Sequence, residues 1–178
     1  MDKLIIENGQ ALAVRVDASF MWRHPLHVIA QGFGSGLSPI APGTVGTLFG
    51  WLCFDVLQRY FASAMNTPAL FFSALLLAFA LGIWACQVTG QHLGIADHGS
   101  MVWDEIVAIF LVLSLTPATF WWQLFAVLVF RFFDIRKPVP IKTLEARVPG
   151  GLGVMLDDLV AAFYTLVVVA LVKALYFS

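Results

Sequence analysis

The sequence predicts an all-α protein that crosses a membrane several times, with about five apolar helices. The first observation is composition: 60% of the 178 residues are apolar and 12% are charged, and the mean hydropathy is +0.87. Soluble domains are about 45–50% apolar and about 25% charged. The second observation is that the apolar residues form long blocks separated by polar segments. A water-soluble fold of this size would have too few polar side chains to cover its surface, so we expect the surplus apolar side chains to face lipid.

Four apolar blocks follow one another along the chain, at residues 44–60, 69–88, 106–130 and 159–177. A helix needs about 20 residues to cross a hydrocarbon core of about 30 Å. The second and fourth blocks meet this requirement. The first block is slightly short and contains Asp55 near its far end, so it is a weaker candidate for a membrane span.

The third block is predicted to form a short helical hairpin over 106–130 in place of one long helix. Pro117 lacks a backbone donor and disfavours helical geometry at the residue before it, so we expect a break at 114–117. Each arm would then span roughly 21–24 Å, at about 1.5 Å per residue. A membrane tolerates such short arms when it thins locally or when the helices tilt.

The distribution of basic residues favours the hairpin, because cytoplasmic loops of membrane proteins are enriched in Lys and Arg. With a hairpin, Arg59 and Lys173 lie on one side of the membrane and all other basic residues lie on the opposite side. We therefore predict a cytoplasmic N-terminus and a C-terminus on the far side. The basic residues on the cytoplasmic side would be Lys3, Arg15, Arg23, Arg131, Arg136, Lys137, Lys142 and Arg147.

Seven of the eleven acidic residues lie between residues 97 and 158. Most of them stand beside the ends of apolar helices, where an unpaired carboxylate is costly. They form three clusters that the hairpin topology brings to one membrane surface: DHGSMVWDE at 97–105, FRFFDIRKP at 130–138 and GGLGVMLDD at 150–158.

Clustered carboxylates without His or Cys at metal-ligand spacing favour a hard cation such as Mg²⁺. Arg131 and Lys137 stand three residues to either side of Asp134, so they share a helix face with it and could hold phosphate oxygens. Thr44, at the end of the glycine-rich run GFGSGLSPIAPGT, is a further candidate donor to phosphate. A bound metal can also lower the pKa of an attacking water. The pattern predicts phosphate chemistry on a lipid headgroup.

Simpler structural roles stay open for each group. The Asp157-Asp158 pair could cap the fourth helix, and the acidic pair at 104–105 could be an ordinary first turn. Arg131 and Asp134 could form a structural ion pair. The basic residues could serve only as topology signals and contacts to anionic lipid, and the glycine-rich run could be only a flexible start to the first helix.

Other classes of function are also compatible with acids in an apolar chain. A small ion or metal transporter would line a path near the membrane midplane with carboxylates, but the clustered acids lie at or beyond predicted helix ends and Asp55 alone approaches an apolar interior. A membrane scaffold without a site is a third alternative. Nucleic acid is not an expected partner, because the net charge of −1 provides no basic field.

Four motifs resemble the phosphatidylglycerophosphatase A family in their order and spacing. They are GFGSGLSPIAPGTVGT (32–47), DHGSMVWDEIV (97–107), FRFFDIRKPVP (130–140) and GGLGVMLDDLVAA (150–162). The resemblance covers roughly residues 27–165. It predicts an N-terminal segment at 1–26 outside the family match and a single helical membrane domain at 27–178.

The resemblance implies a Mg²⁺-dependent enzyme of bacterial phospholipid biosynthesis that hydrolyses phosphatidylglycerophosphate to phosphatidylglycerol and phosphate. The substrate would lie in the inner leaflet of the cytoplasmic (inner) membrane, with the active site on the cytoplasmic side. Whether the protein forms an oligomer is left open. Lys137, Arg131 and Thr44 are expected to bind the substrate. The metal ligands would be Asp104, Glu105, Asp134 and Asp158, and the catalytic residues would be Asp97, Asp104, Glu105, Asp134, Asp157 and Asp158.

Overall fold

A computed structural model describes residues 4–7, 10–13, 16–139, 141, 143 and 147–176. From residue 16 onward the described chain is helical, as predicted. An antiparallel pair of short strands precedes the helices, formed by β1 (Leu4–Glu7) and β2 (Gln10–Ala13). This hairpin is an exception to the predicted all-α class. Its signal is present in the sequence, since Asn-Gly between two apolar runs favours a tight hairpin turn.

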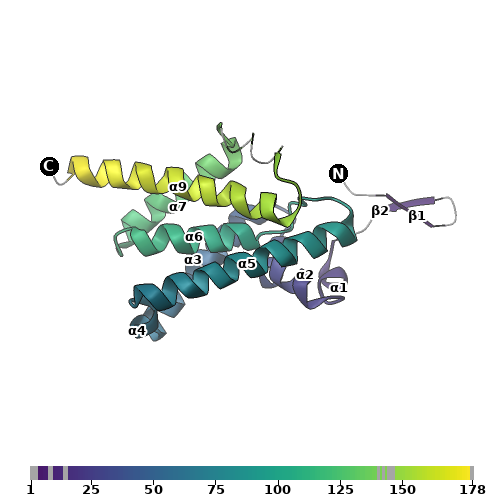
Figure 1. The fold of residues 1–178 in the computed structure, drawn as a ribbon, viewed down its shortest axis with the longest axis horizontal. Helices are drawn as coiled ribbons and strands as arrows, with labels where there is room; N and C mark the ends of the chain where they lie inside the picture. Colours follow the sequence, from purple (N-terminus) through teal and green to yellow (C-terminus); the bar gives the residue numbers. More distant parts are fainter. Residues whose placement is uncertain are drawn as a thin grey trace.

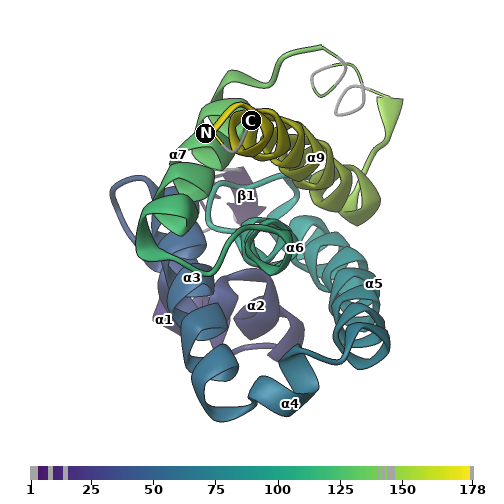
Figure 2. The ribbon, with the colours of Figure 1, turned by 90° about the vertical axis from the view of Figure 1, so that its left-hand side faces the viewer.

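One helix, α6, occupies the centre of the helical bundle, and the other long helices surround it (Figures 1 and 2). α6 contacts α3, α5, α7 and α9, and most of its residues are buried. The helices in chain order are α1 (Ala18–Met21), α2 (Pro25–Ala30), the 3₁₀ helix η1 (Gly32–Leu37), α3 (Pro42–Tyr60), α4 (Ala62–Met65), α5 (Pro68–Leu93), α6 (Trp103–Leu115), α7 (Phe120–Arg136) and α9 (Gly151–Tyr176).

The predicted break in the third apolar block lies between α6 and α7. α6 ends at Leu115, and Thr116 before Pro117 adopts an extended conformation (φ −94°, ψ 144°), as expected for a residue that precedes proline. The Thr116 hydroxyl donates to the Val112 carbonyl at 2.8 Å and so satisfies one of the last carbonyls of the helix. The beginning of α6 and the end of α7 therefore lie at the same end of the bundle, where the cavity described below contains residues from both.

The last helix begins eight residues earlier than the predicted block at 159–177, which rules out the alternative that the Asp157-Asp158 pair caps this helix. Gly151 and Gly153 fit inside the helix because small residues let it approach its neighbours closely. A Cβ atom at Gly151 would stand 2.7 Å from the backbone nitrogen of Gln87 in α5. The Gln87 side chain also accepts a hydrogen bond from the Gly151 N–H at 2.9 Å, which stabilises the start of α9.

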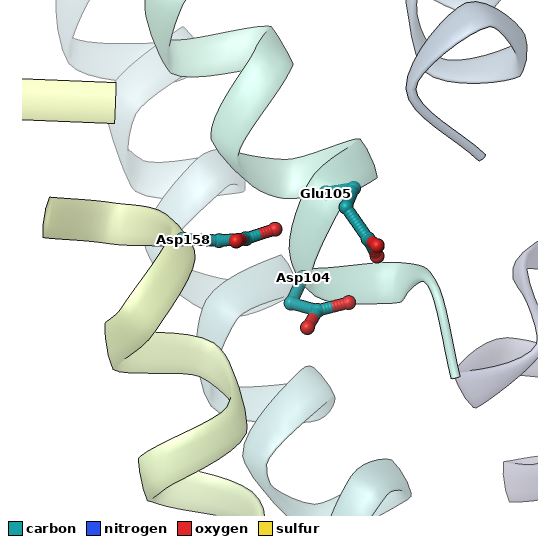
Figure 3. Close-up of side chains that lie close together, drawn as sticks. All are labelled: Asp104, Glu105 and Asp158. Atoms are coloured by element: carbon teal, nitrogen blue, oxygen red, sulfur yellow. The ribbon is translucent and has the colours of Figure 1, made fainter. Parts of the chain in front are cut away.

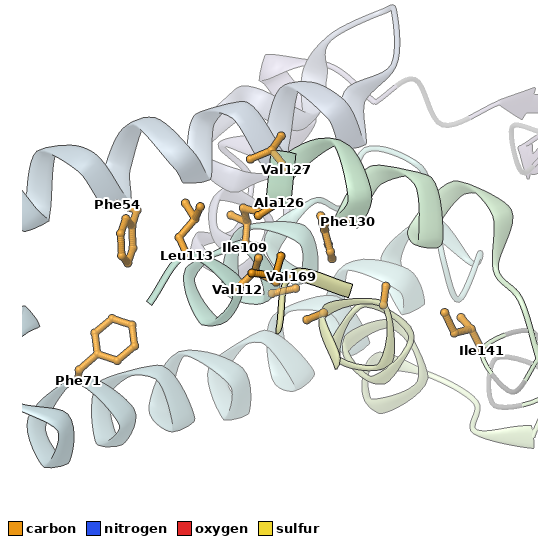
Figure 4. Packing of buried hydrophobic residues seen from close by; sticks show 13 residues of the cluster. Phe54, Phe71, Ile109, Val112, Leu113, Ala126, Val127, Phe130, Ile141 and Val169 are labelled. Atoms are coloured by element: carbon orange, nitrogen blue, oxygen red, sulfur yellow. The ribbon is translucent and has the colours of Figure 1, made fainter. Parts of the chain in front are cut away.

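The bundle core lies between α6 and its neighbours (Figure 4). Ile109 and Val112 of α6 are fully buried there, together with Phe130 of α7. Near the far end of the core, the rings of Phe54 and Phe71 pack edge to face, with centroids 6.5 Å apart. This packing fixes α6 against three neighbouring helices and so determines where the residues of its first turn lie.

Among the described residues, two helices are long and apolar enough to cross a membrane: α5 and α9, each of 26 residues. Most of their apolar surface faces outward, since 22% of the most apolar window of each helix is buried. Leu76 and Leu77 on α5 are 68% and 71% exposed, and Phe163 on α9 is 61% exposed. Apolar surface on this scale indicates contact with lipid. α3, α6 and α7 do not meet the same criterion, so five membrane spans stay a prediction.

Candidate functional site

A polar cavity of about 420 Å³ lies at one end of the bundle, where the starts of α3 and α6 meet the end of α7 and the second turn of α9. All nine residues singled out in the sequence as catalytic, metal-binding or substrate-binding line it. Its lining consists of Ala41, Pro42, Gly43, Thr44, Asp97, Gly99, Met101, Asp104, Glu105, Arg131, Asp134, Ile135, Lys137, Asp157 and Asp158. The three acidic clusters therefore meet at one place in the fold.

Three carboxylates form the centre of this cavity. Asp104 and Glu105 come from the first turn of α6, and Asp158 reaches toward them from α9 (Figure 3). Each offers one oxygen, and the three oxygens lie within 4.8 Å of one another. All three residues are buried, with 9%, 9% and 3% of their surface exposed. We call this group the acidic triad.

The acidic triad has the donor set of a metal site. Within the part of the chain that the structure describes, Asp104 Oδ1, Glu105 Oε2 and Asp158 Oδ2 are buried and accept no hydrogen bond. Buried carboxylates without partners are strongly unfavourable. Oxygen atoms at this spacing are the ligands that Mg²⁺ prefers. The triad therefore fits a hard divalent cation.

Burial raises the pKa of Glu105 to about 8. The negative charges of Asp158 and Asp134 act in the same direction, while a hydrogen bond with Asp104 and the charge of Arg131 oppose it. Burial and the neighbouring Glu105 likewise raise the pKa of Asp104 well above its usual value. A cation among the carboxylates would reverse this tendency, because positive charge favours their ionised forms.

Arg131 connects the acidic triad to two other helices. Its guanidinium forms an ion pair with Asp134 one turn later in α7 and lies 3.7 Å from Glu105 Oε1 in α6. It also donates to the Thr47 hydroxyl of α3 at 3.4 Å. The structural ion pair between Arg131 and Asp134 that the sequence left open is thus present. Because these side chains also line the cavity, the pair holds the guanidinium at the edge of the triad.

Lys137 lies at the end of α7, and its ammonium contacts Asp157 Oδ2 at 2.7 Å. The helix ends at Arg136, and Lys137 follows in a left-handed conformation (φ 40°). Successive residues of a helix point about 100° apart. Asp157 therefore faces Lys137, while Asp158 faces Asp104 and Glu105.

Gly43 is a site residue that sequence reasoning did not single out. A Cβ atom there would collide with Glu105 Oε1 and would stand 3.0 Å from Arg131 Nη2. The Gly43 carbonyl accepts a hydrogen bond from the Thr47 hydroxyl at 2.9 Å. The sequence feature that could have pointed to Gly43 is its place in Pro-Gly-Thr, directly before Thr44, at the first turn of α3. Of the earlier glycines of this run, in η1, Gly36 packs against Ser100 and Gly34 against Met21, and none of them lines the cavity.

The family model for phosphatidylglycerophosphatase A matches residues 28–173, which include every residue of the cavity. The chain belongs to the phosphatidylglycerophosphatase A family. A phosphatidylglycerophosphatase A from Haemophilus influenzae is 44% identical over 147 residues, covering 82% of this chain and 87% of the relative. The Escherichia coli phosphatidylglycerophosphatase A is 37% identical over 139 residues, covering 78% and 77%. No solved structure matches the chain.

Membership of the phosphatidylglycerophosphatase A family makes the protein a phosphatase that acts on a phosphate monoester. Another relative, from Bacteroides thetaiotaomicron, is provisionally named a phosphatidylinositol-3-phosphatase and is 36% identical over 152 residues, covering 82% of this chain and 92% of the relative. The names of these relatives thus include two different lipid headgroups, and both name a phosphate on a lipid.

Proposed function

We propose that the protein is a Mg²⁺-dependent phosphatase that hydrolyses phosphatidylglycerophosphate to phosphatidylglycerol and phosphate in phospholipid biosynthesis. The observation that carries this proposal is the acidic triad of Asp104, Glu105 and Asp158, whose buried oxygens lack hydrogen-bond partners among the described residues. Arg131 and Lys137 border the same cavity. Carboxylates and cations in one pocket suit a metal together with a phosphate group.

The acidic triad would hold the cation. When bound there, Mg²⁺ would lower the pKa of a water molecule and offset the charge of the phosphate oxygens. Asp134, expected in the sequence as a fourth ligand, is paired with Arg131. We infer that its first role is to hold this guanidinium in place. A ligand role for Asp134 would require its carboxylate to contact both the cation and Arg131.

Arg131 is the residue best placed to bind phosphate. A guanidinium presents several donors in a fixed plane and matches the oxygens of a phosphate group. The Arg131 side chain is 14% exposed, so little water screens its charge. Lys137 and Thr44 line the same cavity and would bind the remaining oxygens of the headgroup. Hydrolysis forms a bond from a water oxygen to phosphorus and breaks the bond from phosphorus to the glycerol oxygen, and a proton from the water must reach that glycerol oxygen.

Placement of α5 and α9 in the bilayer would bring the cavity close to the lipid headgroups. Asp158 is the eighth residue of α9, about 10 Å from the start of the helix at about 1.5 Å per residue. Arg136 and Arg147 are exposed near the cavity end, whereas Arg59 and Lys173 belong to the last turns of α3 and α9. This bias supports a cytoplasmic site in the bacterial inner membrane.

The arrangement of acids gives little support to a transporter. The cavity carboxylates gather at one end of the bundle. Asp55, near the opposite end of α3, is exposed and pairs with Arg59 at 3.1 Å. Along the helices that the structure describes, acids do not line a continuous path from one end to the other.

Phosphate release from a panel of lipids tests the proposal. The purified protein in detergent is given phosphatidylglycerophosphate, phosphatidic acid or phosphatidylinositol-3-phosphate, with Mg²⁺ or with excess chelator. We expect phosphatidylglycerophosphate to be the best substrate and the chelator to abolish its hydrolysis. Full activity in chelator would refute the requirement for a metal. A clear preference for phosphatidylinositol-3-phosphate would refute phosphatidylglycerophosphate as the substrate.

A further inference from the structure

We propose that an apolar groove between α5, α6 and α9 binds one acyl chain of the lipid whose phosphate lies in the polar cavity. This inference rests on the proposed function, because it assumes that the phosphate belongs to a lipid. The groove has a volume of about 260 Å³. Its walls include Leu76 and Phe79 of α5, Val107 and Leu111 of α6, and Leu159 of α9.

The groove adjoins the polar cavity at Asp104, which lines both. Asp104 is the one charged residue among the described residues that line the groove. Leu111 lies seven residues further along α6, about 10 Å away at about 1.5 Å per residue. A lipid with its phosphate beside Asp104 could therefore extend a chain along α6 without leaving the protein surface.

The groove also opens toward the lipid. Phe72 and Leu76 on its α5 wall are 42% and 68% exposed, and α5 and α9 are the two helices apolar and long enough to cross a membrane among those described. A chain could enter sideways from the bilayer while its headgroup stays at the polar cavity. The free energy gained per methylene favours an acyl chain over water in such a groove.

Other hollows of the bundle do not share this geometry. A cavity of about 560 Å³ near the far end of α3 is lined by Trp51 and Phe120, and also by Asp55 and Arg59. None of the described residues that line this second cavity also lines the polar cavity that contains the acidic triad. Bulk lipid would cover it as it covers any exposed apolar surface. The contact with Asp104 is what distinguishes the groove as part of a substrate site.

A tryptophan substitution tests the groove, with a matched control one residue away. Leu76 lines the groove, whereas its neighbour Leu77 on α5 is equally exposed and does not. For L76W, we expect the ratio of kcat/KM for long-chain to dihexanoyl phosphatidylglycerophosphate to fall about tenfold, the effect of excluding roughly two methylenes from apolar contact. L77W should leave this ratio within about twofold of the unsubstituted protein. Equal ratios in L76W and L77W would overturn the proposal.

Photolabelling provides a readout that does not depend on turnover. The protein in lipid nanodiscs is irradiated with phosphatidylglycerophosphate that carries a diazirine on one acyl chain, and the labelled residues are mapped by mass spectrometry. We expect labelling at 72–79 and 107–111 that excess unlabelled phosphatidylglycerophosphate removes and excess phosphatidylcholine does not. Labelling spread over the outer faces around Leu77 and Phe163, without competition, would show bulk lipid and refute the groove.

The two experiments separate the inference from the function on which it rests. Absence of hydrolysis for both chain lengths would refute the proposed function, and competed labelling in the groove would still establish a lipid-phosphate site. Hydrolysis of both lipids together with uncompeted labelling would retain the phosphatase and refute the groove.

Discussion

Asp104 of α6 and Asp158 of the neighbouring helix α9 lie close together. One carboxylate oxygen of each lies within 4.8 Å of the other and of a carboxylate oxygen of Glu105. The two residues come from distant parts of the chain, and both are buried. Such proximity between like charges is unfavourable unless a cation or a proton lies between them. The account of this protein as a metal-assisted phosphatase depends on this relationship.

Replacing Asp158 with Asn should lower kcat/KM for phosphatidylglycerophosphate by about 100-fold or more, because loss of one electrostatic contact to a reacting group has effects of this size. In chelator, the same variant should unfold at a higher temperature than the wild type, since it replaces a buried carboxyl, whose ionised form is unfavourable there, with a neutral amide. Phosphate release and thermal unfolding in detergent measure the two effects. Asp55→Asn, an exposed acid at the opposite end of α3, is the control and should keep activity within about twofold.

Arg131→Lys should lower kcat/KM by about tenfold to 100-fold while keeping the positive charge. A lysine lacks the planar fork that contacts Glu105, Asp134 and Thr47 in the structure. Steady-state kinetics on detergent-solubilised protein measure this change. Arg136→Lys provides the comparison, because Arg136 is exposed on the same helix and does not line the cavity. Equal kinetics for the two variants would remove Arg131 from the proposed site.

Substitution of Gly43 should impair activity in proportion to side-chain size. An alanine Cβ would collide with Glu105 Oε1 and press on Arg131, and a valine would displace both further. We therefore expect kcat/KM to fall from glycine to alanine to valine, with unfolding temperatures changing much less than activity. Full activity of Gly43→Val would show that the first turn of α3 does not constrain the acidic triad.

A buried histidine should make the fold sensitive to mild acid. His27 is 2% exposed, its Nδ1 lies 3.0 Å from the Phe20 carbonyl, and its Nε2 lies 2.8 Å from Nδ1 of His92. Burial lowers the pKa of His27 below its usual 6.5. The hydrogen bond to the Phe20 carbonyl opposes this shift, and the charges of His92, His24 and Arg23 reinforce it. The neutral form is therefore favoured in the folded state.

The unfolded chain then binds more protons than the folded protein between the lowered pKa and about 6.5, so stability falls as pH decreases through this window. We expect His27 to lower the unfolding temperature between pH 7.5 and pH 5.5 relative to His27→Gln, although His27→Gln would be less stable at neutral pH. The raised pKa of Glu105 acts in the opposite direction in both proteins and cancels in this comparison. Thermal unfolding across this pH range checks the prediction. An unchanged pH dependence in His27→Gln would exclude His27 as the cause.

The sequence was sufficient for local features of the fold and for the composition of the site. Hydrophobic blocks and Pro117 predicted the positions of α3, α5, α6 and α7, because these depend on apolar runs and on the backbone chemistry of proline. The acidic clusters predicted which residues would meet, since a carboxylate beside an apolar helix is costly unless it shares a partner or a cation with other polar groups. Their roles in metal binding and catalysis stay predictions for the experiments described above.

Features that depend on contacts between distant segments could not be predicted. The start of α9 was missed because its glycines usually disfavour a helix, whereas Gly151 here allows a close approach to Ile83 and Gln87 in α5. The contact between Lys137 and Asp157 depends on how α7 ends beside α9. The pair formed by His27 and His92 joins α2 to α5, and no spacing in the sequence indicates it.

Titration of Mg²⁺ against thermal unfolding tests the central claim most directly. For a cation that binds the folded state, a concentration of about 100 times Kd adds about 2.7 kcal/mol to stability, which corresponds to roughly 5–11 °C for a chain of this size. We predict a saturable rise of this order in the unfolding temperature of the wild type and a much smaller rise in Asp158→Asn. An equal rise in both proteins, or no rise in the wild type, would contradict a metal site built on Asp104, Glu105 and Asp158.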